Sequence, residues 1–189
     1  MRMRFKKVLV SFILLSLMGG SMIVADTAIN KIKLSINGSA LNDSAIVVDG
    51  TTYVPLRQAA SLFGAFVTWD NNKQVNINRP NIHMMAVKDD TYFQAVWKGS
   101  TVTFDVLVQG DSVETPISEI KLVIADPNGV EKEIYYEANP ENVKIFKLDP
   151  NVKVTYEFKK SGDYKLRMYM KPEKSNDWVV VSEKVIVSK

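Results

Sequence analysis

DGTTYVPLR (residues 49–57), followed by LFGAFVTWD (residues 62–70), decides the first part of the fold. Asp49-Gly50 is a strong signal for a two-residue hairpin turn, because both turn positions need a backbone conformation that Asp, Asn and Gly tolerate best. The apolar run at 45–48 and the segment 51–54 are therefore predicted as the two strands of a β-hairpin.

A short helix is predicted directly after this hairpin. Pro55 suits its start, since the first turn of a helix has no intrahelical N–H bond to lose. Gly64 provides a left-handed stop, and a strand resumes at 66–69. The side chains at helical spacing, predicted to form the buried face, are Leu56, Ala59, Ala60 and Phe63.

The pattern changes beyond Arg79-Pro80-Asn81, which we interpret as a linker. Apolar and polar residues then alternate with period two in several runs, for example at 101–108 and 152–158, and no helical period is present. Seven or eight short strands at this spacing are typical of a β-sandwich. The sequence thus predicts a small α+β domain (30–80; an antiparallel sheet with one helix) followed by an all-β Ig-like sandwich domain (84–189).

The first 25 residues have the pattern of a signal peptide. A positively charged start is followed by an apolar run at 8–18 and then by small residues. We expect cleavage after Ala25, with Ser21 as the alternative site and retention as a membrane anchor as the third option. The predicted location is secreted or extracellular, including association with the cell wall.

Removal of this leader changes the charge of the protein. Residues 1–25 contain four of the 24 Lys and Arg and none of the 21 Asp and Glu, so the remaining chain has a formal charge of −1. Nucleic-acid binding normally needs a concentrated basic face. We expect no such face here, and therefore no binding of nucleic acid. The chain contains no cysteine, so disulfide bonds do not contribute to its stability.

The segment from about 32 to 78 resembles the copper amine oxidase N-terminal-like domain, a module of secreted and cell-wall proteins of Gram-positive bacteria. The matching blocks are Ile36-Asn37-Gly38, residues 47–57, residues 62–65, Val67-Thr68-Trp69-Asp70 and Val75-Asn76-Ile77. The resemblance implies a helix over an antiparallel sheet and a non-catalytic surface or adhesion module, without the copper site or the cofactor tyrosine of the oxidases. It implies mostly structural roles for the motif positions Tyr53, Pro55, Leu56, Arg57, Gly64 and Trp69.

The second half resembles Ig-like and PKD-like sandwich domains. Residues 154–158 and the following Gly162-Asp163-Tyr164 have the pattern of a tyrosine corner, in which the phenol hydroxyl bonds back to the chain. This pattern indicates the fold and carries almost no information about function.

Catalytic chemistry has little support in the sequence. His83 is the single histidine and there is no cysteine, which excludes a copper amine oxidase site and zinc or thiol chemistry. We therefore predict no catalytic residues, no metal and no cofactor. Carboxylates in loops, Asp89-Asp90 and Asp111 with Glu114, leave a secreted hydrolase or enzyme-accessory protein as the alternative function. The acidic turns 70–72 and 126–129 have oxygen ligands for calcium but match ordinary turn chemistry.

Three residues are candidates for binding: Arg57, Trp69 and Tyr169. Arg57 is expected either to contact a ligand or to pair with a carboxylate such as Asp70 on the surface. Tyr169 falls on the polar parity of its strand and should face outward, where exposed rings stack on sugars or anchor proteins. The expected partner is a cell-wall polymer or an envelope protein, with no nucleic acid and no membrane contact after cleavage of the leader.

Overall fold

The computed structural model describes residues 30–36, 39–41, 45–70, 72–141, 144–148 and 152–189. The predicted leader and its cleavage sites lie outside these residues. Most of the described chain is β-strand. Its one described helix is α2 (Leu56–Leu62), and no helix in this part of the chain is long and apolar enough to cross a membrane.

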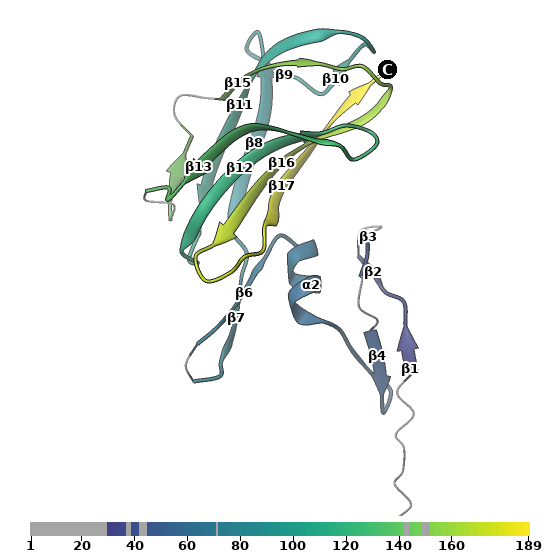
Figure 1. The fold of residues 1–189 in the computed structure, drawn as a ribbon, viewed down its shortest axis with the longest axis vertical. Helices are drawn as coiled ribbons and strands as arrows, with labels where there is room; N and C mark the ends of the chain where they lie inside the picture. Colours follow the sequence, from purple (N-terminus) through teal and green to yellow (C-terminus); the bar gives the residue numbers. More distant parts are fainter. Residues whose placement is uncertain (1–29, 37–38, 42–44, 71, 142–143, 149–151) are drawn as a thin grey trace, which may run out of the picture.

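Two sheets form a β-sandwich in the C-terminal part of the chain (Figure 1). The first sheet consists, in spatial order, of β10 (Ala95–Val96), β17 (Val179–Ser188), β16 (Gly162–Pro172), β12 (Ile117–Ala125) and β13 (Glu131–Ala138). The second consists of β14 (Phe146–Lys147), β11 (Thr101–Asp111), β8 (Asn81–Lys88) and β9 (Thr91–Tyr92), with β15 (Val152–Glu157) also pairing with β11. The β10–β17 pair is parallel, and the other pairs of the two sheets are antiparallel.

Alternation along the strands places one face of each sheet in a shared core. In β16 the side chains of Tyr164, Leu166, Met168 and Met170 are buried, while the residues between them face outward. Phe104 from β11 and Phe158 after β15 pack in the same cluster, with ring centroids 6.5 Å apart. The prediction of a β-sandwich from period-two alternation is confirmed at these strands.

The predicted tyrosine corner is present. The backbone N–H of Lys160 donates to the phenol oxygen of Tyr164 at 2.9 Å, and the Tyr164 side chain is 1% exposed. Its ring meets Phe158 edge-on, with centroids 4.9 Å apart. The corner therefore ties the start of β16 to the chain just before it.

The N-terminal region, residues 30–78, is built from short hairpins around α2. One sheet contains β1 (Asn30–Ile32), β4 (Ala45–Val48) and β5 (Thr51–Tyr53); β2 (Ser35–Ile36) pairs with β3 (Ser39–Ala40), and β6 (Phe66–Trp69) pairs with β7 (Val75–Asn78). These are three separate sheets among the described residues. The single antiparallel sheet expected for the α+β domain is thus not formed by the described residues, where no strand pairing joins these three sheets.

Local turn chemistry was predicted correctly here. Asp49 and Gly50 have φ values of +48° and +74°, as a type I′ hairpin turn requires, and they connect β4 to β5. α2 follows Pro55 and ends before Gly64, whose φ is +68°. The order strand, turn, strand, helix, strand is therefore confirmed.

The predicted buried face of the helix is only half right. Ala59 and Ala60 are buried, but Leu56 is 39% exposed and Phe63 is 55% exposed. The helix is seven residues long and contacts β6 and β17. The side of this short helix that contacts its neighbours carries Ala59 and Ala60, so the larger side chains of Leu56 and Phe63 remain at the surface.

The N-terminal region packs against the sandwich through a few close contacts. A Cβ atom added at Gly64 would lie 3.0 Å from the carbonyl oxygen of Val180, so the two backbones approach closely there. Phe66 is 2% exposed and belongs to the sandwich core. In addition, the Asn78 amide donates to the Thr115 hydroxyl at 3.3 Å.

The chain passes from β7 to β8 through Arg79 and Pro80 alone. Asn81, the third residue of the predicted linker, is the first residue of β8 and pairs with Asp111 of β11. His83 also lies on β8, with an exposed side chain. The linker is therefore two residues long instead of three, because β8 belongs to the sandwich sheet from its first residue.

Candidate binding cleft

Two of the three candidate residues line the same open hollow. Arg57 lies in the first turn of α2, and Trp69 is the last residue of β6. Both line a hollow of about 470 Å³ between the β6–β7 hairpin and the sandwich loops that contain Thr115 and Glu173. Tyr169 lies on β16 and does not line this hollow.

A second hollow of about 450 Å³ adjoins the first. The two share Arg57, Val67, Pro172 and Ser175, and the second is also lined by Trp178. Both volumes fall in the range of ligand-binding pockets. We call the pair of hollows, with Arg57 between them, the Arg57 cleft.

Arg57 is exposed and forms no ion pair within the part of the chain that the structure describes. The surface pair with Asp70 is not formed. Instead, the Asp70 carboxylate accepts hydrogen bonds from the backbone N–H groups of Asn72 and Gln74, both at 2.8 Å. The guanidinium of Arg57 therefore has no carboxylate partner among the described residues.

Two tryptophans line the cleft, one in each hollow. Trp69 is 61% exposed. Trp178 is half-buried, and Tyr169 meets it edge-on with ring centroids 6.5 Å apart. The ammonium of Lys121 lies 4.5 Å from the Trp178 ring centroid, a distance typical of cation–π contact. Trp178 is thus held in place from the sheet side.

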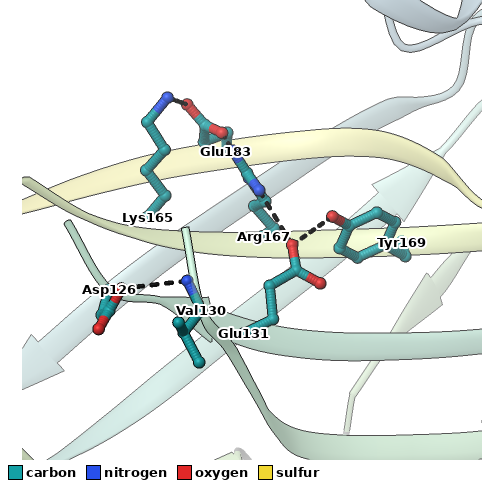
Figure 2. A network of polar contacts seen from close by, with 7 residues as sticks. All are labelled: Asp126, Val130, Glu131, Lys165, Arg167, Tyr169 and Glu183. Atoms are coloured by element: carbon teal, nitrogen blue, oxygen red, sulfur yellow. Dashed lines mark hydrogen bonds and ion pairs between the residues drawn. The ribbon is translucent and has the colours of Figure 1, made fainter. Parts of the chain in front are cut away.

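Tyr169 belongs to a polar network on the outer face of the first sheet (Figure 2). Its hydroxyl donates to Glu131 at 2.6 Å, and Glu131 also accepts from Arg167 at 2.9 Å. Arg167 donates in turn to Glu183 at 2.7 Å, and Lys165 pairs with the same carboxylate. Burial, together with the hydrogen bond to Glu131, raises the pKa of Tyr169 to about 12.

The outward orientation expected for Tyr169 is confirmed, but its role is indirect. The hydroxyl is used within the sheet and the ring supports Trp178. Tyr169 therefore positions a residue of the Arg57 cleft and is not itself part of its lining.

The two groups of loop carboxylates proposed for hydrolysis lie at opposite ends of strand β8. Asp89-Asp90 follow the C-terminal end of β8, whereas Asp111 pairs with the first residue of that strand. The eight residues of β8 separate the two sites by roughly 26 Å. Glu114, in turn, forms an ion pair with Lys144 at 3.3 Å.

The acidic turn at 126–129 uses its carboxylate within the chain. Asp126 accepts hydrogen bonds from the backbone N–H groups of Asn128 and Val130 and pairs with Lys160. The hydrogen bond from Lys160, followed by these backbone bonds, holds the pKa of Asp126 below its ordinary value. Among the described residues, no group of three or more His, Asp or Glu side chains is placed to hold a metal ion.

Sequence reasoning missed the contribution of the sandwich to this cleft. Trp178, Pro172 and Thr115 lie more than 35 residues from the hairpin they face. In the sequence, Trp178 is one of several aromatic residues beside predicted strands. No local pattern indicates which of them meets the N-terminal region.

A known protein family matches much of the chain. The family model described as the copper amine oxidase N-terminal domain matches residues 35–145, which is more than half of the chain and extends from β2 past β13. No curated protein matches the chain. Domains of this family are non-catalytic accessory modules. The chain belongs to the copper amine oxidase N-terminal domain family.

Proposed function

We propose that this protein is an exported, non-catalytic binding module of the cell surface or extracellular matrix, and that the Arg57 cleft holds a cell-wall polymer or a segment of another envelope protein. One observation carries the proposal: two exposed motif residues, Arg57 and Trp69, line one open cleft. An exposed tryptophan contributes little to a core, whereas tryptophan and arginine are the side chains most enriched at binding hot spots.

Export rests on the pattern of residues 1–25. Mass spectrometry of the N-terminus of the protein recovered from its natural envelope or medium tests it. We expect the chain to start at Asp26, or at Met22 if cleavage follows Ser21. An intact N-terminus would support the membrane-anchored alternative instead.

The binding function is tested by co-sedimentation of the purified protein with peptidoglycan, with purified wall glycans and with envelope protein extract. Trp69→Ala should weaken capture at least about tenfold. Trp97→Ala is the matched control, because Trp97 is 74% exposed and follows β10, at the opposite end of the sandwich. No capture by any fraction, or equal loss in both variants, would contradict the proposal.

A further inference from the structure

The charges around the Arg57 cleft favour one class of ligand over another. Its positive side chains are Arg57 and Lys174, and its negative ones are Asp70, Glu114, Glu173 and Asp177. Adding Lys144, the partner of Glu114, still leaves more negative than positive charge. A polyanion is therefore not attracted here, since its binding depends on a surplus of Lys and Arg.

Uncharged hydrogen-bonding groups line the larger hollow. Asn76, Asn78 and Thr68 contribute amide and hydroxyl groups, and Arg57 adds guanidinium donors. Asn78 also holds the buried Thr115 hydroxyl, which fixes one wall of the hollow. Amide, hydroxyl and guanidinium groups of this kind match a ligand rich in hydroxyls, because each hydroxyl both donates and accepts.

The two tryptophans add apolar platforms in separate hollows. Trp69 lines one and Trp178 the other, with Arg57 between them. A sugar ring has an apolar C–H face and a rim of hydroxyls, so it can use an aromatic face and polar neighbours together. Two such platforms suit a chain of sugars better than a single one.

From these observations we infer that the Arg57 cleft binds an uncharged glycan chain, with at least one sugar unit against Trp69 and another in the hollow lined by Trp178. This inference rests on the proposed binding function and specifies its ligand class. Phosphate-bearing polymers and protein segments are the competing ligands.

The test uses the purified protein and three probes: tetramers of N-acetylglucosamine, tetramers of glucose, and inorganic polyphosphate as the polyanion. Binding is measured by calorimetry and by tryptophan fluorescence. At least one tetramer should bind, more tightly than its monomer, with an affinity that changes less than about twofold between roughly 50 and 500 mM salt. Polyphosphate should not compete.

Variants assign the binding to the cleft. Trp69→Ala should weaken tetramer binding at least about tenfold, and Trp97→Ala should leave it within about twofold. Trp69→Ala is expected to fold, because the side chain is 61% exposed; an unchanged melting temperature verifies this. Trp178→Phe keeps a ring in the second hollow and should weaken the tetramer more than the monomer.

The outcomes separate the inference from the proposed function. If envelope fractions capture the protein but neither tetramer binds, or if polyphosphate binds with steep salt dependence, the glycan inference is overturned and the binding function stands. Capture that disappears after protease treatment of the extract would identify a protein partner and likewise overturn it. If no envelope fraction captures the protein, both the proposed binding function and the glycan inference are contradicted.

Discussion

The sandwich contains a large buried core, whereas Phe66 is the one large apolar side chain that is fully buried among the described residues of the N-terminal region. In the sandwich, residues such as Phe104, Phe158 and Leu166 are at most 2% exposed. In the N-terminal region the buried hydrophobic residues are Ala45, Ala59, Ala60, Ala65 and Phe66, and the exposed large ones are Ile32, Tyr53, Val54, Leu56, Phe63, Trp69 and Ile77. One region is organised around a core, and the other around contacts at its surface.

This difference has a physical origin in size. A region of about 50 residues without disulfides or metal is marginal as an independent fold. Here the shortage is met by packing Phe66 into the sandwich core and by the close approach of Gly64 to Val180. The short hairpins are then free to present side chains for binding, because the sandwich provides most of the stability.

The largest expected effect is on the isolated N-terminal region. Residues 26–82 alone should melt far below the intact chain or without a cooperative transition, since the contacts of Phe66 and Gly64 with the sandwich are lost. Circular dichroism melts of both chains measure this. Equal melting temperatures would show that the region has a sufficient core of its own.

A matched pair of phenylalanine truncations compares the two regions directly. Phe158 is 0% exposed and Phe63 is 55% exposed. Phe158→Ala should lower the free energy of unfolding by about 3–5 kcal/mol, and Phe63→Ala should change it by no more than about 0.5 kcal/mol. Urea titrations give both values. A large loss at Phe63 would mean that its ring has a buried partner in solution.

A pair of glycine substitutions measures the contact between the regions. Gly50 and Gly64 both have positive φ, but a Cβ at Gly50 has nothing within 4 Å. Gly50→Ala should therefore cost about 1 kcal/mol from backbone strain alone. Gly64→Ala should cost about 2–3 kcal/mol, because it adds the 3.0 Å approach to the carbonyl oxygen of Val180. Equal losses of unfolding free energy for the two variants would indicate that the two regions can separate at Gly64 without destabilising the protein.

The smallest expected effect is the acid sensitivity of one sandwich turn. The pKa of Asp126 is below its ordinary value of 3.8 in the folded protein, chiefly through its hydrogen bond from Lys160. Its contribution to stability is therefore complete above about pH 4 and is lost as the pH falls through the lower folded value. Asp126→Asn should show a smaller loss of unfolding free energy from neutral pH to pH 3 than the natural protein. An unchanged pH dependence of the unfolding free energy would show that this turn does not contribute to the acid sensitivity of the protein.

Sequence reasoning succeeded where structure is determined by neighbours in the chain. The Asp49-Gly50 turn, the Pro55 helix start and the Tyr164 corner all depend on residues within a few positions, so their patterns are visible locally. Strand alternation in β16 is similarly local, because a single face of the sheet is buried along the whole strand.

Prediction from the sequence failed where the burial of a side chain depends on segments that are distant in the chain. Helical spacing gave Leu56 and Phe63 the same expected burial as Ala59, but the positions of β6 and β17 decide which side of α2 is covered. Arg57 and Trp69 line the cleft, whereas Tyr169 contacts it only through Trp178, which lies in the β16–β17 connection. Long-range packing of this kind leaves no periodic signal in the sequence.

Strand β17 has a practical consequence for measurements on this protein. Val179, its first residue, lines the Arg57 cleft, and its far end pairs with β10 at Ser188. The nine residue steps from Val179 to Ser188 place the two ends of the strand roughly 30 Å apart. Immobilisation through Lys189 on a sensor surface would thus turn the cleft toward the solution, and large polymers could reach it without steric hindrance from the support.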